Sequence, residues 1–143
     1  MAVAVQVVFD CSDPDSQAEF WSKALGYAVE PPPDGYDSWV DFLRANGMEQ
    51  RIGSANAIVD PEGRGPRFYF QQVPEPKERK NRLHLDLNVS GGGDVTAEKR
   101  HARVAAEAKR LGEIGATQLT TMTNDDEHWV VMRDPEGNEF CLQ

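Results

Sequence analysis

Hydrophobic and polar residues follow the same order of patterns in both halves of the chain. In the first half, residues 3–9 are rich in β-branched side chains and predict a strand. Apolar residues at helical spacing then predict a helix over residues 14–25, with Asp13 as its N-cap and Gly26 at its end. Further strands are predicted at residues 27–30, 38–44 and 67–73, with a loop before the last of them.

The second half begins the same order again. Residues 83–89 alternate between apolar and polar side chains, as a strand with one buried face does. After three consecutive glycines, apolar residues at helical spacing predict a helix that ends near Gly112. Three more strands are predicted at residues 116–123, 127–133 and 138–143.

The four letters DPEG occur twice, at residues 60–63 and again 74 positions later at residues 134–137. Proline restricts φ and glycine accepts a positive φ, so both segments are good turns, and each precedes the last strand of its half. We interpret the chain as an internal duplication within one domain. Its first module spans residues 1–74, its connector 75–82 and its second module 83–143.

The composition limits the classes of function. A chain of 143 residues with 39% hydrophobic and 27% charged residues fits one globular domain. The net charge of −9 argues against a nucleic-acid partner, because phosphates would be repelled. No segment approaches the ~18 apolar residues of a membrane span. The N-terminal stretch lacks a basic leader and two cysteines make no secreted disulfide framework, so we expect a cytoplasmic protein with reduced thiols.

Strand alternation predicts which side chains point away from the helices, because successive residues of a strand face opposite sides. In residues 83–89 the alternate apolar residues Leu83, Leu85, Leu87 and Val89 form the packed face. The opposite face of that strand carries His84, Asp86 and Asn88. By the same reasoning, the residues on this face of the other strands are Ala4, Gln6, Val8, Tyr69, Gln71, Glu139 and Cys141.

Three separated motifs resemble the vicinal oxygen chelate superfamily, which includes glyoxalase I, extradiol dioxygenases and bleomycin-resistance proteins. They are DPxxxAxFWxxxLG from Asp13, KNRLHLDL from Lys80 and HWVVMxDPEGNEFC from His128, and they are similar to the glyoxalase-like branch. The resemblance extends from Val3 to Leu142. It implies an α+β fold in which two tandem βαβββ modules form an open, cup-shaped mixed sheet with the helices outside and a small-molecule ligand inside.

The resemblance also implies positions for metal ligands, one from the first and one from the last strand of each module. These positions are Gln6, Gln71, His84 and Cys141, and Cys141 replaces the glutamate of the family. Thiolate and imidazole suit zinc, whereas amide oxygens are weak donors, so only two of the four are strong ligands for zinc, nickel, manganese or iron. Alternatively, His84 is a hydrogen-bonding residue or a general base held by Asp86, and Cys141 is a small buried hydrophobic residue.

Three further residues are candidates for ligand contact or catalysis. His128 and Trp129 adjoin in one strand, and alternation leaves open which of them faces inward, where an aromatic ring would stack on a flat ligand. Both also fit a core or rim position. Alternation places Glu139 on the same face as Cys141, where its carboxylate could transfer a proton. Alternatively, Glu139 is a solvated charge at the end of a strand.

Two classes of function therefore remain open. The first is a lyase or isomerase that acts on a small oxygenated metabolite, in which His84 or a metal stabilises an enolate and Glu139 moves a proton. The second is a binding protein that sequesters an aromatic or cationic compound, as bleomycin-resistance proteins do. The missing carboxylate ligands favour binding over glyoxalase I activity, and an oxygenase would need two histidines and a carboxylate. The resemblance further implies a homodimer.

Overall fold

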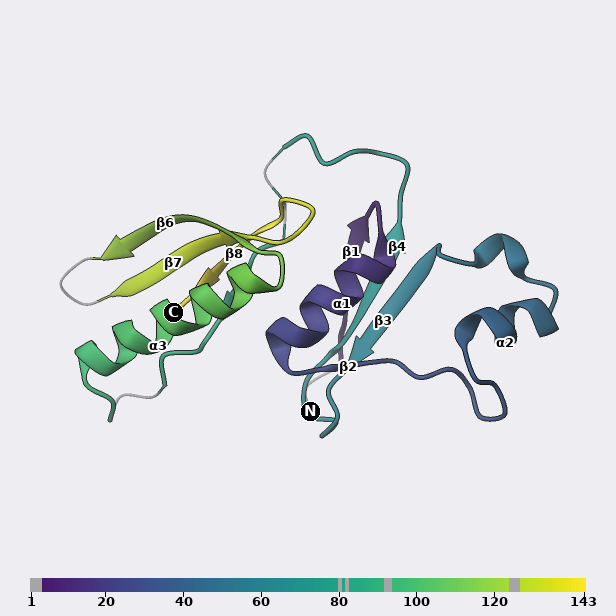
Figure 1. Cartoon of the computed structure of the whole chain (residues 1–143), viewed down its shortest axis with the longest axis horizontal. Helices are drawn as coiled ribbons and strands as arrows, with labels where there is room; N and C mark the ends of the chain where they lie inside the picture. Colours follow the sequence, from purple (N-terminus) through teal and green to yellow (C-terminus); the bar gives the residue numbers. More distant parts are fainter. Residues whose placement is uncertain (1–3, 80, 82, 92–93, 124–126) are drawn as a thin grey trace. The chain divides into compact units, whose positions relative to one another are not determined.

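The computed structural model describes residues 4–79, 81, 83–91, 94–123 and 127–143 of the chain. Two compact units, Met1–Pro76 and Lys77–Gln143, each contain a four-stranded mixed sheet (Figure 1). The boundary between the units falls within residues 75–82, the predicted connector. No helix in the described ranges is both long and apolar enough to cross a membrane.

The first unit consists of one sheet, one long helix packed against it and a short helical insertion (Figure 1). Its elements in chain order are β1 (Gln6–Cys11), α1 (Pro14–Leu25), β2 (Ala28–Val29), α2 (Trp39–Ala45), the 3₁₀ turn η1 (Glu49–Arg51), β3 (Ala55–Val59) and β4 (Arg67–Gln72). In the sheet, β1 and β4 run parallel, and β3 and then β2 continue it in antiparallel directions.

The second unit repeats this arrangement. Its elements are β5 (Leu85–Leu87), α3 (Ala97–Glu113), β6 (Thr117–Thr123), β7 (His128–Arg133) and β8 (Glu139–Leu142). Here β5 and β8 run parallel, and β7 and β6 continue the sheet in antiparallel directions. Both DPEG turns lie between the last two strands of their sheet. The predicted α+β fold of two tandem modules is therefore confirmed.

The ends of α1 follow from the residues that flank it. The carboxylate of Asp13 accepts a hydrogen bond from the backbone N–H of Ser16 at 3.1 Å. Gly26 ends the helix with a φ of 71°, a conformation that residues with a Cβ rarely adopt. The predicted helix, its N-cap and its C-terminal glycine are confirmed.

Residues 38–44 belong to the helix α2, so the prediction of a strand there is wrong. Ser38 is the N-cap: its hydroxyl accepts a hydrogen bond from the N–H of Asp41 at 3.0 Å and donates one to the Asp41 carboxylate at 2.7 Å. The apolar side chains after Ser38 recur at positions i, i+1, i+3 and i+4, which fits a helix and not a strand. The cap and this spacing together explain the difference.

The remaining strand of the first sheet is β3, which lies in a stretch that the sequence pattern left without an element. Three of its residues are alanine or asparagine, which are uncommon in strands. The structure nevertheless places it between β4 and β2, with Ile58 fully buried. In the second unit, Leu83 lies outside β5 and is 45% exposed, so the prediction that it packs under the helix is wrong.

In each unit, the apolar face of the sheet forms the core with a helix. The ring of Phe9 lies 5.5 Å from the rings of both Trp21 in α1 and Phe70 in β4, measured between centroids. In the second unit, α3 buries Val104 and Leu111, and it contacts β6, β7 and β8. Alternation correctly assigned the packed residues Phe9, Phe68, Phe70, Leu87, Phe140 and Leu142.

Candidate functional site

The parallel strands β5 and β8 position the candidate site. Their register places Asp86 beside Cys141, and the neighbouring positions of β8, Phe140 and Leu142, are buried. Because successive side chains of a strand point to opposite faces, Asp86 and Cys141 share the face of the sheet that α3 does not cover. We call this face the open face of the second sheet.

His84 directly precedes β5 and completes a cluster with these two residues. Its Nε2 atom lies 3.2 Å from the Sγ atom of Cys141 and 3.2 Å from the Oδ1 atom of Asp86. The three donor atoms all lie within 4.8 Å of one another. His84 and Asp86 are exposed, whereas Cys141 is only 8% exposed. Solvent therefore reaches the cluster from one side, and the thiol lies on the protected side.

Both contacts of the imidazole use the same nitrogen, which limits the chemistry of the cluster. In a nucleophile–histidine–acid relay, the acid bonds Nδ1 while Nε2 faces the nucleophile. Here the carboxylate of Asp86 and the thiol of Cys141 both approach Nε2 of His84. The arrangement therefore does not orient His84 as a base for Cys141, whereas three donor atoms this close together could hold a metal ion.

The donor set fits zinc. Thiolate, imidazole and carboxylate bind zinc at about 2.0–2.3 Å in a tetrahedron, so adjacent ligand atoms lie roughly 3.4–3.6 Å apart. The N–S and N–O separations of 3.2 Å in the cluster are close to this spacing. A soft thiolate also favours zinc over manganese or magnesium. Three protein ligands leave the fourth position of a tetrahedron for an oxygen of a ligand or water.

Glu139 lies on the open face, two residues before Cys141. Its carboxylate is 3.7 Å from Nη2 of Arg133, the residue opposite it in β7. The side chain of Asn81 fixes the backbone of Glu139, accepting from its N–H and donating to its carbonyl, both at 3.2 Å. Glu139 is therefore a paired carboxylate in a defined position beside the cluster.

The register of β7 with β8 decides which side of β7 shares the open face, a question that alternation leaves open. Val131 lies beside Cys141, so Trp129, two residues earlier, is on the same face. The neighbouring residues His128 and Val130 point toward α3 instead. The structure thus brings Trp129 to the side of the cluster and places His128 on the opposite side of the sheet.

His128 packs against α3 through a stacked pair of imidazoles. The ring centroids of His101 and His128 are 4.0 Å apart, with 26° between the ring planes. Nδ1 of His128 lies 2.8 Å from the hydroxyl oxygen of Thr123 in β6. Burial, together with the positive charge that His101 can carry, lowers the pKa of His128 below its usual value. The stack is therefore favoured when His128 is neutral.

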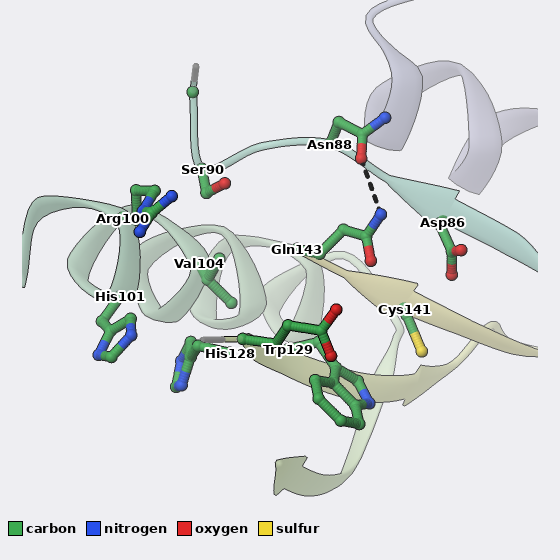
Figure 2. A pocket seen from close by; sticks show the side chains of 12 residues that line it. Asp86, Asn88, Ser90, Arg100, His101, Val104, His128, Trp129, Cys141 and Gln143 are labelled. Atoms are coloured by element: carbon green, nitrogen blue, oxygen red, sulfur yellow. Dashed lines mark hydrogen bonds between the residues drawn. The ribbon is translucent and has the colours of Figure 1, made fainter. Parts of the chain in front are cut away.

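A pocket of about 570 Å³ opens where β5 and β8 end and β7 begins (Figure 2). Asp86 and Cys141 of the cluster line one end of it, and Arg100 and His101 of α3 line the other, with Trp129 also in the wall. The other lining residues are Asn88, Ser90, Gly91, Val104, Glu127, His128 and Gln143.

The two glutamines proposed as metal ligands lie in the first unit, which does not bring them together. The amide oxygen of Gln6 accepts a hydrogen bond from Nη1 of its neighbour Arg67 at 2.8 Å. Gln71 is exposed and lies beside Asp10, four positions further along β1, which is about 13 Å at ~3.3 Å per residue. Metal binding by Gln6 and Gln71 stays a prediction.

Arg67 is one of the candidate site residues that the sequence analysis did not predict. It forms a fork with the carboxylate of Glu30, at 2.9 Å from Nε and 2.5 Å from Nη2, and its guanidinium lies 5.3 Å from the ring centre of Tyr69. The hydrogen bonds to Glu30 raise the pKa of Arg67 above its usual value. The register of the two sheets shows how the repeats correspond: Tyr69, opposite Ala57 in β3, takes the place that Cys141, opposite Val131 in β7, takes in the second sheet, and Arg67 lies two residues before Tyr69 on the same face.

Tyr69, another predicted ligand-contacting residue, lines a second pocket of about 270 Å³ in the first unit. Side chains of α2 form one wall, and Ala55 and Ala57 of β3 line it with small side chains that leave space. Arg67 and Glu30 lie at this pocket as well, already paired with each other. This pocket depends on α2, the element that the sequence analysis predicted as a strand.

Comparison with solved structures gives the same fold. A possible glyoxalase from Bacillus cereus has a TM-score of 0.61 at 12% identity, over 100% of this chain and 99% of that one. A glyoxalase/bleomycin resistance protein/dioxygenase family enzyme from Burkholderia phytofirmans PsJN has a TM-score of 0.59 at 16% identity, over 96% and 94%. A mutant fosfomycin resistance protein FosX from Listeria monocytogenes, complexed with Mn(II) and 1S,2S-dihydroxypropylphosphonic acid, has a TM-score of 0.61 at 9% identity, over 100% and 90%.

Identities this low establish the fold alone, and the comparison with curated proteins gave no match. The family relationship comes from the sequence. The model of the family described as "Glyoxalase-like domain" matches residues 6–143, which include the cluster and nearly all of both units. The chain therefore belongs to the glyoxalase-like domain family, and its fold is that of the vicinal oxygen chelate superfamily.

Proposed function

We propose that this chain binds a small oxygenated metabolite beside a divalent metal ion held by His84, Asp86 and Cys141. The donor atoms of these residues favour zinc. The observation that carries the proposal is the position of His84 Nε2, at 3.2 Å from both the thiol sulfur and the carboxylate oxygen. The adjoining pocket of about 570 Å³ has the size of a small-molecule site, for which the usual range is about 300–1,000 Å³.

Residues of the first unit favour a metal site in which, unlike in glyoxalase I, every protein ligand comes from the second unit. In the sheet register, Tyr69 takes the position in the first repeat that Cys141 takes in the second, and the guanidinium of Arg67, two residues earlier on the same face, is paired with Glu30. A guanidinium there repels a cation, so we assign all three protein ligands of the metal to the second unit. FosX was solved with Mn(II), whereas the thiol of Cys141 favours a softer ion here.

Each residue of the cluster has a defined task in this proposal. A bound divalent ion would supply Lewis-acid polarisation of an oxygen of the metabolite. Cys141 and His84 supply the strong donors, and Asp86 supplies a negative charge at the solvent side, where it attracts the ion. Trp129, on the same face, offers an aromatic surface to the bound molecule.

Metal content tests this proposal. We expect wild-type protein incubated with zinc and desalted to retain about one ion per chain, measured by mass spectrometry. The variants H84A, D86N and C141S should each lose most of it while keeping the far-ultraviolet circular dichroism of the wild type. Cobalt(II) should give a thiolate-to-metal charge-transfer absorption in the wild type that C141S lacks.

The chain offers a matched control in its other thiol. Cys11 is 4% exposed, lies in the first unit and donates its S–H to the carbonyl of Gln71 at 3.5 Å. C11S should retain zinc and the cobalt absorption. Equal zinc content in C141S and the wild type would show that the cluster is not the metal site.

A metal-dependent lyase or isomerase is the second candidate, and the position of Glu139 favours it. The carboxylate of Glu139 lies on the same face as the cluster, where a proton acceptor would have to be, and Arg133 lies 3.7 Å from it. We expect E139Q to retain zinc but to lose the exchange of carbon-bound hydrogen for deuterium in hydroxyacetone or the hemithioacetal of methylglyoxal. Absence of such exchange in the zinc-loaded wild type would leave binding as the function.

Assembly is a separate property. The family resemblance implies a homodimer, which stays a prediction. Light scattering coupled to size-exclusion chromatography measures the mass of the particle in solution. The mass of a single 143-residue chain at high concentration would contradict a dimer.

A further inference from the structure

Arg100, which has no side-chain partner in the part of the chain that the structure describes, lines the pocket at the end opposite the cluster of His84, Asp86 and Cys141. Arg100 in α3 is half-buried, and within the described ranges its guanidinium forms no hydrogen bond or ion pair. Figure 2 shows its side chain on the helix, away from Asp86 and Cys141. Three other arginines of this unit have partners: Arg103 bonds the carbonyl of Ser90, Arg110 the carboxylate of Glu107, and Arg133 that of Glu139.

A partly buried charge without a partner is unfavourable, because it has lost some of its hydration and gained no counter-charge. The chain has a net charge of −9, so acidic residues are abundant, yet no carboxylate among the described residues forms an ion pair with Arg100. His101 follows Arg100 in the same wall and can donate a further hydrogen bond. The two side chains therefore form a site at which an anionic group from outside the chain would be stabilised.

We propose that the pocket takes a small organic acid, whose anionic group lies against Arg100 and His101 and whose other end presents an oxygen to the cluster of His84, Asp86 and Cys141. This inference rests on the function proposed above, and it adds the class of the ligand. An inorganic anion would leave most of a 570 Å³ pocket to water, so we infer an organic ligand. Trp129 lies in the wall and would contact its apolar part.

An acidic residue of the pocket restricts the ligand further. Asp86 is a metal ligand in this proposal, but Glu127 also lines the pocket, so a second anionic group beside Glu127 would meet a carboxylate. Asn88 and Gln143, joined by a hydrogen bond of 3.0 Å, offer neutral amide groups to hydroxyl or carbonyl oxygens. The pocket therefore suits a molecule with one acidic group and further neutral oxygens.

Pairs of acids and their amides test this inference, since each pair has the same shape and differs in charge. We would titrate lactate with lactamide, and mandelate with mandelamide, into zinc-loaded protein by calorimetry at about pH 7. The acid should bind the wild type about tenfold to a hundredfold more tightly than its amide, as expected for a charge-assisted contact. R100Q should lose this preference and retain its zinc. K99Q is the matched control, because it removes an equal charge from an exposed neighbour outside the pocket and should keep the preference.

The outcomes separate this inference from the function on which it rests. Zinc bound by the wild type without any preference for acids, or an equal preference in R100Q, would overturn the assignment of Arg100 and leave the metal site standing. A preference for acids that depends on Arg100 but persists in zinc-free C141S would confirm the anion site and contradict the role of the metal. Loss of the preference in K99Q as well would mean that only the general charge of α3 matters.

Discussion

The Nε2 atom of His84 lies 3.2 Å from the Sγ atom of Cys141, which is 57 residues further along the chain. The parallel pairing of β5 with β8 produces this contact, because it places the His-Leu-Asp segment beside the last strand. The thiol is buried and the imidazole is exposed. The reactivity of Cys141 should therefore report on whatever occupies the cluster.

We expect zinc to slow the reaction of one of the two thiols with a disulfide reagent, because a metal-bound thiolate is unavailable to attack it. The part of the reaction that zinc slows should be present in C11A and absent in C141A. The absorbance of the thiol released from the reagent measures the reaction rate in each variant. Persistence of the zinc effect in C141A would contradict the assignment of Cys141 as a ligand.

The pair of Arg67 and Glu30 should contribute modestly to the stability of the first unit. Both side chains are partly exposed, at 33% and 27%, so we expect R67Q and E30Q each to lower the free energy of unfolding by about 1 kcal/mol. The double variant should lose less than the sum of the two, as measured by urea denaturation. Zinc content should not change, whereas a loss of zinc in R67Q would link this pair to the metal site.

The two DPEG turns should differ in their sensitivity to loss of the aspartate. Asp134 is 3% exposed and accepts from the N–H groups of Glu136 and Asn138, both at 2.9 Å. D134A leaves these donors without their acceptor in a buried position, so we expect a loss of about 2–3 kcal/mol in urea denaturation. Asp60 accepts similar bonds closer to solvent, where water replaces the carboxylate, so D60A should cost less.

The turn at Asp60 also has a pH dependence of defined sign. The backbone N–H groups of Glu62 and Gly65 hold the pKa of Asp60 below its usual value. A lowered pKa in the folded state stabilises the fold above the usual pKa, and this stabilisation disappears as the pH falls through about 4 and below. D60N should therefore show a weaker dependence of stability on pH in this acidic range, measured by urea denaturation, than the wild type does.

The stacked imidazoles predict a second pH dependence, nearer neutrality. Because burial and His101 lower the pKa of His128, the folded state binds fewer protons than the unfolded state just below about pH 6.5. The stability that neutral, stacked His128 gives the fold is therefore fully present above about pH 6.5 and is lost as the pH falls. H101F keeps a ring against His128 without a charge, so it should lose less stability than the wild type between about pH 7.5 and 5.5.

Urea denaturation at the two pH values measures this difference, and equal losses in both proteins would contradict it. Three other charged residues line the same pocket, Asp86 in β5, Arg100 on α3 and Glu127 beside His128. R100Q serves as the control, because it removes a permanent charge but leaves the titrating pair. Its loss of stability over this pH range should resemble that of the wild type.

Local patterns in the sequence determined most of the elements and the face on which each side chain lies. Asp13 and Gly26 bound α1 through bonds within one turn, and alternation separated Asp86 from its apolar neighbours in β5. The duplicated DPEG revealed the two modules. These features depend on residues that are close together in the chain, so a single sequence displays them.

Other features depended on which distant segments become neighbours. Alternation could not tell whether His128 or Trp129 faces the cluster; the register of β7 with β8 decided it. The convergence of His84, Asp86 and Cys141 likewise required β5 to lie beside β8, and Arg100 reached the pocket only through the packing of α3. Apolar and polar patterns specify a face but not a partner, because burial is favourable against many surfaces, and only the tertiary fold selects one.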